Sequence, residues 1–201
     1  MKNLLLLFIA FAFAFACSSP TTLVKSWRVP ESTFTPEEFK KVMVVAFVKD
    51  EASRKIAEDR VSKINEHFYP SYPVFSGQEV MENKDQVLAT LKEQGYDAVI
   101  TMSLLLKAAD DKWVAEKYQG GYYDYHSSYM TDYYRPGYYV DGSKYYIITN
   151  VFSIKSNKLI WSATTVTPEP ASLQEGIDSI LYTVVKQMKK DGFLPGKKSG
   201  K

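Results

Sequence analysis

The sequence contains few of the residues on which most metal and disulfide sites depend. Its 201 residues include one cysteine and two histidines. A single cysteine excludes an internal disulfide and any multi-cysteine zinc site, and two histidines leave little for a histidine-based metal site. A chain of this size can bury a sufficient core without such cross-links. We therefore expect a domain that folds without metal, and we assign no metal ligand and no cofactor.

An excess of charge of one sign is also missing. The chain has 25 Lys and Arg against 23 Asp and Glu, a formal net charge of +2. Nucleic-acid-binding domains usually carry a basic excess on one face. A hydrophobic fraction of 45% and a charged fraction of 24% are ordinary for a globular domain. The composition therefore predicts a folded domain with no nucleic-acid partner.

Motifs for nucleotide binding and nucleophilic catalysis are missing as well. Residues 49–53 follow the first apolar strand-like run without the glycine that a phosphate-binding turn requires. No G-x-S-x-G occurs, and the acidic residues between 110 and 132 lack the spacing of a calcium loop. His67 is interpreted as the cap of a helix and His126 as a loop residue. We therefore assign no catalytic residue and expect a protein that is not an enzyme.

An N-terminal apolar run is present but is too short to cross a membrane. Lys2 supplies a positive charge, and the apolar run extends over residues 4–15. A membrane-spanning helix needs about 20 residues, whereas this length is typical of a cleavable export signal. We interpret residues 1–16 as a signal peptide.

The signal ends at the single cysteine. Ala14-Phe15-Ala16-Cys17 resembles the lipobox of bacterial lipoproteins through its small residue and cysteine, whereas Ala14 and Phe15 depart from the usual pattern. The resemblance implies that Cys17 becomes the first mature residue and carries a diacylglyceryl group and an N-acyl chain such as palmitate. Ala14-x-Ala16 also fits the general signal-peptidase pattern, so ordinary secretion is the alternative.

The residues after Cys17 indicate to which membrane the protein is sorted and how the folded domain is connected to its anchor. Two or more acyl chains make membrane attachment stable. By the same resemblance, Ser18 in place of Asp implies the outer membrane, and the lack of nearby acids favours its periplasmic face. Residues 17–37 are predicted to be a lipidated N-terminus and a tether, because they are rich in Ser, Thr and Pro and show no helical or strand period.

The folded domain is predicted over residues 38–193, with a flexible tail at 194–201. A continuous apolar run from Val42 to Val48, rich in β-branched valine, predicts a strand buried on both faces of a parallel or mixed sheet. A helix at 52–67, a short strand starting at Val74 and Phe75, a helix at 83–94 and a strand at 98–106 follow. These elements predict a β-α-β-α-β order.

The second half of the domain is predicted to add a hairpin and a helix. Strands at 145–154 and 158–165 are joined by a turn at Ser156 and Asn157. Ser172 and Glu175 form a capping box that begins a helix ending at Gly192. The expected fold class is α/β, with a single mixed sheet of about five strands and three main helices, in the order β-α-β-α-β-(Tyr-rich insertion)-β-β-α.

Periodicity also predicts where individual side chains lie. In the helix at 52–67 the apolar stripe is expected to be buried and the charged residues to face solvent. The i,i+4 pairs Asp50–Arg54 and Lys55–Asp59 are expected to form ion pairs in solvent. The charged residues expected to be exposed are Arg54, Lys55, Glu58, Asp59 and Lys63. Strand alternation places Leu159 and Trp161 on one face and Ile160 on the other. Trp161 is expected in the core.

Tyrosine is the most unevenly distributed residue. Eleven of the 15 tyrosines fall between residues 118 and 146, and the insertion at 118–143 mixes them with Gly, Ser and Asp. Such mixtures form adaptable contact surfaces, although the rings could instead pack on one another or the insertion could be disordered. The residues assigned to partner binding are Tyr122, Tyr123, Tyr125, Tyr129, Tyr133, Tyr134, Tyr138 and Tyr139.

The layout resembles the small envelope lipoproteins that have a TolB-N-terminal-like or CsgG-like domain, including the LpoB-type activators. The residues that carry the resemblance are the Val42–Val48 strand and the hairpin at 156–162, behind a lipobox. It covers about residues 38–193, and the Tyr-rich insertion has no counterpart in that group. The resemblance implies a protein that assembles with or activates other envelope proteins and is not an enzyme.

These observations predict a non-catalytic, membrane-anchored lipoprotein of the bacterial envelope that binds another envelope component, either protein or glycan. Two alternatives remain open. One is an envelope enzyme acting on glycan, with Asp50, Glu58 and Asp110 as its acids, and a close pair of carboxylates in a cleft would favour it. The other is a subunit of a secretion assembly.

Overall fold

The structure is a computed structural model that describes residues 21–30, 39–48, 50–77, 79, 83–105 and 144–194. The signal peptide, Cys17, the tyrosines assigned to partner binding and the tail at 195–201 lie outside the described residues. The predictions about them therefore stay predictions.

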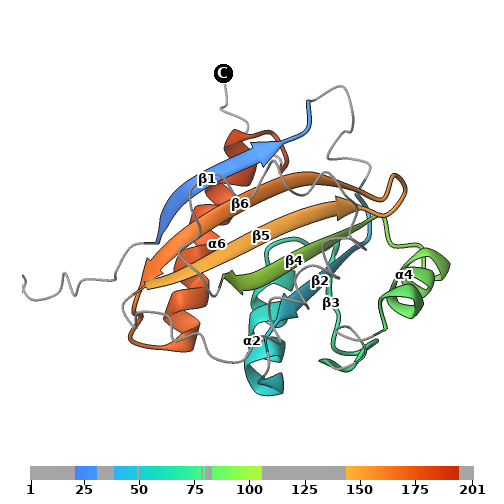
Figure 1. The fold of residues 1–201 in the computed structure, drawn as a ribbon, viewed down its shortest axis with the longest axis horizontal. Coiled ribbons are helices and arrows are strands. Elements are labelled where there is room, and N and C mark those ends of the chain that lie inside the picture. Colours follow the sequence, from blue (N-terminus) through green and yellow to red (C-terminus); the bar gives the residue numbers. More distant parts are fainter. Residues whose placement is uncertain are drawn as a thin grey trace, which may run out of the picture.

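The described residues form one mixed sheet with helices on both faces (Figure 1). The strands lie in the order β1-β6-β5-β4-β2-β3. β2 is parallel to β3 and β4, whereas the pairs β4–β5, β5–β6 and β1–β6 are antiparallel. The elements are β1 (Thr22–Arg28), β2 (Val42–Phe47), α2 (Glu51–Ser62), β3 (Phe68–Pro70), α4 (Lys84–Glu93), β4 (Ala98–Leu105), β5 (Lys144–Ser153), β6 (Lys158–Pro168) and α6 (Leu173–Lys190).

The α/β class, the mixed sheet and the three helices are confirmed. The sheet has six strands rather than about five, because β1 lies inside the segment predicted to be a tether. β1 pairs with β6, and its register shifts between Leu23 and Lys25. This bulge interrupts the period of two by which a strand is recognised in sequence. Pairing with β6, more than 130 residues away, therefore creates a strand that local pattern does not reveal.

The middle strand of the β-α-β-α-β unit lies earlier than predicted. α2 ends at Ser62, and the turn after it closes as the His67 amide donates to Asn65 Oδ1 at 3.0 Å. His67 therefore follows the helix by several residues and does not cap it. β3 begins at Phe68, while the amides of Val74 and Phe75 both donate to the Ser71 carbonyl in a turn.

α4 and α6 each end just before the glycine that was predicted to terminate them. Gly95 has φ +70°, a left-handed conformation that glycine adopts without steric strain. The Gly95 amide donates to the Lys92 carbonyl and the Tyr96 amide to the Leu91 carbonyl, which is a Schellman motif. Gly192 (φ +71°) closes α6 in the same way. At the start of α6, the Glu175 amide donates to Ser172 Oγ at 3.2 Å, in agreement with the predicted cap.

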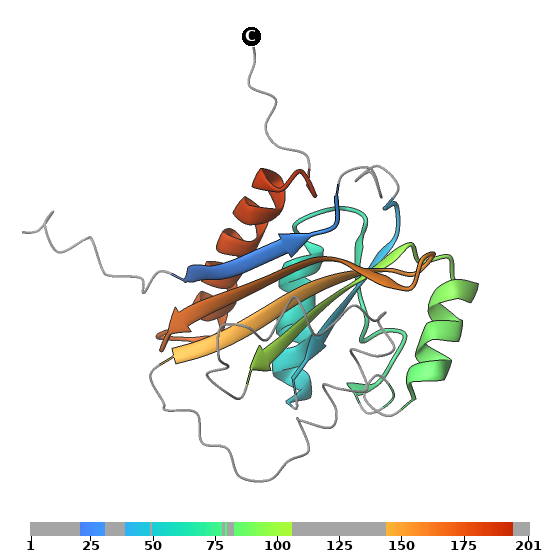
Figure 2. The same cartoon turned by 45° about the horizontal axis from the view of Figure 1, so that its top comes forward.

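Two hydrophobic cores lie on opposite faces of the sheet. α2 and α6 cover one face together, and α4 covers the other near β2 (Figures 1 and 2). Every residue of β2 is buried, as predicted for a strand between two layers. The first core includes Val44, Ala57, Val61, Ile100, Trp161, Ile177, Leu181 and Met188. The second includes Met43, Val45, Phe75, Val87, Leu91, Val99, Phe152 and Leu159.

Trp161 is fully buried, as predicted, but its neighbour Leu159 lies in the opposite core. Val151 is paired with Trp161 and Phe152 with Leu159, so Ile160 is an extra residue in β6. This bulge overturns the predicted alternation, because one inserted residue reverses the faces of all residues beyond it. β6 therefore contributes large side chains to both cores.

Candidate functional site

A buried ion pair lies where α2 passes the chain between β3 and α4. Arg54 and Glu58 are 1% and 0% exposed, although the sequence pattern predicts both in solvent. Arg54 Nε donates to Glu58 Oε1 at 3.0 Å. A charged pair can be buried only if its remaining donors and acceptors find partners.

Every side of the Arg54 guanidinium is engaged. Nη1 contacts both carboxylate oxygens of Glu51 at 3.2 Å. Nη2 donates to Ser71 Oγ at 2.7 Å and to the Phe75 carbonyl at 3.1 Å. The guanidinium therefore ties α2 to the turn that follows β3.

The Glu58 carboxylate is equally engaged. Besides Arg54, Oε1 accepts from the Ala46 amide at 3.1 Å and from Ser71 Oγ at 2.8 Å. Oε2 accepts from the amides of Ser71 and Tyr72 at 2.7 and 3.0 Å. Five donors thus converge on one carboxylate that has no exposed surface, so in this conformation it offers no oxygen to a substrate. The arrangement joins β2, α2 and the turn after β3.

The predicted solvent pairs on α2 are replaced by other partners. Asp50 caps the helix, and its Oδ2 accepts from the Ser53 amide at 2.7 Å and from Ser53 Oγ at 2.6 Å. These hydrogen bonds lower the pKa of Asp50 because they favour the carboxylate. Tyr72 Oη donates to Asp59 Oδ1 at 2.8 Å, and this hydrogen bond raises the pKa of Tyr72. Lys55 Nζ lies 3.9 Å from Glu51 Oε1.

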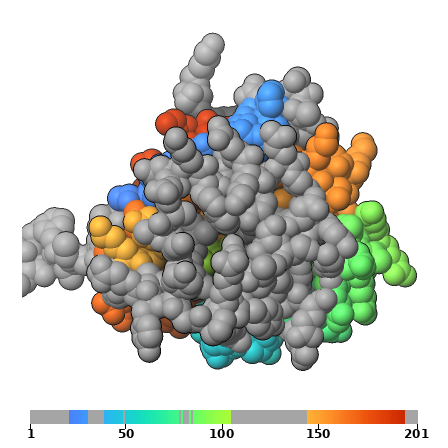
Figure 3. Space-filling view, in the orientation of Figure 1, coloured from blue at the N-terminus to red at the C-terminus, as the bar shows by residue number. Residues whose placement is uncertain are grey.

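The second polar feature is a row across the sheet on the face that α4 partly covers. Thr101 is opposite both Val45 and Asn150, Asn150 is opposite Ser162, and Ser162 is opposite Trp27. Residues directly opposite one another share a face, and Val45 belongs to the core beneath α4. Thr164 lies one row further along β6 on the same face. We call Thr101, Asn150, Ser162 and Thr164 the polar row; Figure 3 views the molecule from the side of this face, with α4 at its right.

The polar row is buried but lacks partners. Its four side chains are at most 3% exposed. Within the part of the chain that the structure describes, Thr101 Oγ1, Asn150 Oδ1, Ser162 Oγ and Thr164 Oγ1 have no hydrogen-bond partner. Buried polar atoms are usually paired. This face can therefore accept hydrogen bonds that the described residues do not supply.

Sequence reasoning missed both features. A signal existed for the polar row, because Thr101 and Ser103 alternate with Ile100 and Met102 in an otherwise apolar strand. Which residues join Thr101 in a row depends on the register of β5 and β6. No local signal distinguishes Arg54 and Glu58 from the exposed charges beside them, because their partners come from the turn after β3.

Metal sites and membrane-spanning helices are both missing from the part of the chain that the structure describes. No group of three or more His, Cys, Asp or Glu within the described residues is placed to hold a metal ion. None of their helices has the length and apolar character needed to cross a membrane.

No protein-family model and no curated protein matches the chain. Among solved structures, it is similar to a PelC dodecamer from Paraburkholderia phytofirmans, with 14% identity and a TM-score of 0.40, over 82% of this chain and 94% of that one. It is also similar to the lipoprotein GNA1162 from Neisseria meningitidis, with 13% identity and a TM-score of 0.35, over 75% of this chain and 98% of that one. Identities and TM-scores this low show no family for the chain.

Proposed function

We propose that this protein is a non-catalytic lipoprotein of the bacterial envelope. Cys17 carries the lipid that holds the protein to the periplasmic side of the outer membrane. The folded domain binds another envelope component through the tyrosine-rich insertion.

The observation that carries the binding role is the pairing of β4 with β5. The two strands are antiparallel neighbours out to Leu105 opposite Tyr146. A turn of a few residues suffices to join such a pair, but residues 106–143 intervene. Connections this long between neighbouring antiparallel strands are uncommon in compact domains unless they serve a function or are disordered. A tyrosine-rich segment that the sheet does not need for its connection is a natural contact surface.

The anchor is supported by the sequence around Cys17. The chain's single cysteine follows a small residue at the end of an export signal. In an oxidising compartment an unmodified lone thiol would be reactive. Acylation accounts for both the position of the cysteine and its uniqueness.

A binding role agrees better than catalysis with the acids that an enzyme would use. Of the three acids in the alternative hypothesis, Asp50 caps α2 and Glu58 is enclosed by five donors. Asp110 lies outside the described residues. Asp50 and Glu58 are thus engaged in holding α2 in place.

The binding role is tested by removing the insertion. Residues 118–143 are replaced with a four-residue Gly/Asn linker in the full-length protein, and envelope partners are captured by crosslinking in intact cells. A matched variant keeps the length but changes the eight assigned tyrosines to serine. Both variants should fold and reach the membrane, and both should lose the crosslinked partner.

Two results would count against the binding role. If the deletion unfolds the domain, the rings belong to its core. If both variants keep every crosslinked partner, the contact surface lies elsewhere. Co-sedimentation of the same proteins with purified peptidoglycan then separates a glycan partner from a protein partner.

The anchor is tested by the mass of the mature N-terminus. A chain beginning at Cys17 with added acyl chains is expected, and Cys17→Ser should leave the signal uncleaved or the protein mis-sorted. A mature protein with an unmodified Cys17 would exclude the anchor.

A further inference from the structure

The fold begins only four residues after the predicted lipid attachment site. Thr21 is 7% exposed, although it lies in the segment that is predicted from sequence to be a tether. Its amide donates to Ser179 Oγ at 3.0 Å, and its carbonyl accepts from Thr183 Oγ1 at 3.1 Å. Its hydroxyl lies 2.8 Å from Thr167 Oγ1. Three hydrogen bonds therefore fix Thr21 to α6 and β6.

This attachment limits how far the domain can stand from a membrane. Positions 17 and 21 are four residues apart, and a fully extended chain spans at most about 3.3–3.6 Å per residue, or roughly 14 Å here. The polar region on each side of a bilayer is itself roughly 5–8 Å thick. If Cys17 carries the lipid, Thr21 cannot lie far outside the headgroups.

The residues around Thr21 define one end of the molecule. Thr22 is opposite Val166, Tyr145 is opposite Thr167, and Lys144 is opposite Pro168. α6 begins at Leu173, shortly after β6 ends. We call this the anchor-proximal end, formed by Thr21, Thr22, Lys144, Tyr145, Pro168 and Leu173. Figure 2 shows β1 beginning and β6 ending there, and Figure 3 shows the blue atoms of β1 beside the yellow atoms of β5.

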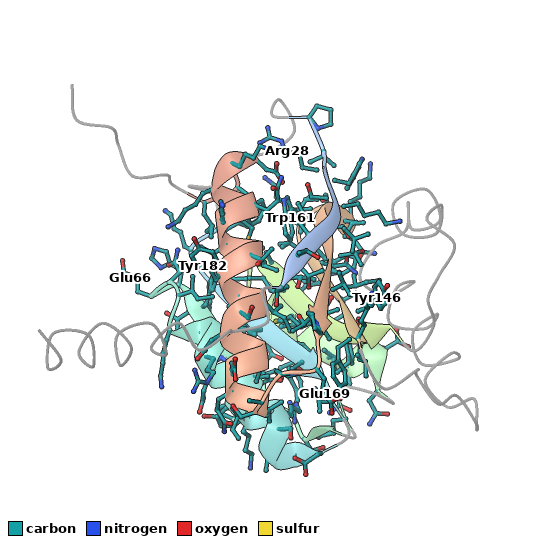
Figure 4. All side chains as sticks on the ribbon, turned by 90° about the vertical axis from the view of Figure 1, so that its left-hand side faces the viewer. Arg28, Glu66, Tyr146, Trp161, Glu169 and Tyr182 are labelled. Carbon is teal, nitrogen blue, oxygen red and sulfur yellow. The ribbon has the colours of Figure 1, made fainter. Side chains whose placement is uncertain are left out.

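The surface of this end suits a lipid interface. Tyr145 is 37% exposed, Leu173 is 44% exposed, and Val24 on the adjoining bulge is 42% exposed. Tyrosine is enriched where membranes meet water, because its ring is apolar and its hydroxyl is polar. Exposed Lys144 and Glu169 have opposite charges, and Glu175 adds a negative charge in the first turn of α6, so apolar contact rather than charge attraction would hold this end. Figure 4 looks onto it, with Glu169 near the start of α6 and Tyr146 across the sheet from that helix.

We propose that the anchor-proximal end lies against the lipid surface, with Tyr145 and Leu173 in the interface. The proposal rests on lipid attachment at Cys17. It fixes the orientation of the domain, because the β5–β6 turn at Ser156 is at the opposite end of β6, roughly 30 Å away at about 3.3 Å per strand residue. Leu105 and Lys144, between which the tyrosine-rich insertion runs, then both lie on the membrane side.

The orientation is tested with single-site nitroxide labels on the full-length, lipidated protein. The lipid would block Cys17, the chain's only cysteine, so Tyr145→Cys, Leu173→Cys and Ser156→Cys each give one reactive thiol. The proteins are reconstituted in vesicles of phosphatidylethanolamine with a minority of phosphatidylglycerol. Collisions with oxygen, which concentrates in lipid, are compared with collisions with a water-soluble nickel chelate.

Labels at positions 145 and 173 should show an oxygen-to-nickel ratio several-fold above that at 156. Equal ratios at all three positions in a protein whose N-terminal mass shows acylation would overturn the orientation alone. Dipolar broadening between labels at 173, without preference for oxygen, would show a second copy at this end and would also overturn it. A mature N-terminus without lipid would instead refute the anchor on which the proposal rests.

Discussion

The two polar sets buried in this protein differ in how their hydrogen bonds are met. The Arg54–Glu58 pair is surrounded by partners from β2, α2 and the turn after β3. In the polar row, one side-chain oxygen of each residue has no hydrogen-bond partner among the described residues. A buried polar group whose bonds are complete stabilises a particular packing, whereas one whose bonds are incomplete destabilises the fold unless something else binds it. The first set therefore holds the fold together, whereas the second is buried with hydrogen-bonding capacity that the described residues leave unused.

The largest effect is expected at Glu58. Glu58→Ala leaves the Arg54 guanidinium buried without its carboxylate, which should lower the free energy of unfolding by about 3–5 kcal/mol. Chemical denaturation of the purified domain measures the change. The double variant Arg54→Met with Glu58→Gln removes both charges, keeps a side-chain oxygen that can accept from the amides of Ala46, Ser71 and Tyr72, and should recover part of the loss. If the single and double variants are equally unstable, the charges are not what holds this region.

Trp161 provides an apolar reference for the same comparison. It is fully buried, and its Nε1 donates to Asp191 Oδ2 at 2.9 Å. Its ring centroid lies 6.2 Å from that of Phe193. Trp161→Ala should lower the free energy of unfolding by about 3–5 kcal/mol. Trp161→Phe keeps most of the packing and should cost clearly less. An unchanged melting temperature for Trp161→Ala would mean that the residue is not in the core.

Changes in the polar row should act in the opposite direction. A buried hydroxyl without a partner destabilises a protein by about 1–3 kcal/mol, so Thr101→Val or Ser162→Ala should raise the free energy of unfolding by roughly 1 kcal/mol. Ser71→Ala is the matched control, because Ser71 Oγ bonds both Arg54 and Glu58 and its loss should lower stability. If Ser162→Ala and Ser71→Ala shift stability in the same direction, the contrast between the two sets is wrong.

The smallest effect concerns pH at an exposed carboxylate. Hydrogen bonds from Ser53 lower the pKa of Asp50 in the folded state. The stabilisation of the fold by ionised Asp50 is therefore complete above the pKa of Asp50 in the unfolded chain. It is lost as pH falls through the lower pKa of Asp50 in the folded state. Thermal unfolding across the acidic range should show a shallower decline for Asp50→Asn than for wild type. Glu79→Gln is a parallel test, because hydrogen bonds with Ser76 lower the pKa of Glu79. An unaltered acid-side slope in both variants would contradict the assignment.

Local pattern was enough to predict most elements, because their signals lie within a few residues. Val42–Phe47 is uniformly apolar, Ser172 caps its own helix, and Gly95 closes α4 with a left-handed residue. The strand β1 and the faces of β6 could not be predicted in this way. Both depend on a bulge, and a bulge is fixed by the partner strand.

The same reasoning explains what was missed among the polar residues. Arg54 and Glu58 belong to a helix whose other charges are ordinary surface residues. What makes them different is the distant Ser71 and the Phe75 carbonyl, which the helix pattern does not contain. The polar row forms only when three strands are aligned. Residues with long-range partners are thus the ones that sequence reasoning places wrongly.

The seam between β1 and α6 has a consequence for the order of folding. Thr21 and Ser179, which are hydrogen-bonded, are separated by 158 positions, so almost the whole chain must be available before the first strand finds its place. Contacts this distant in sequence form slowly, because closing the large loop between them costs entropy before the contacts contribute any favourable free energy. A ribosome or translocation channel delivers β1 first and its partners last. The segment nearest the proposed lipid should therefore remain unpaired until α6 has emerged, and release of that helix should be the event that completes the sheet.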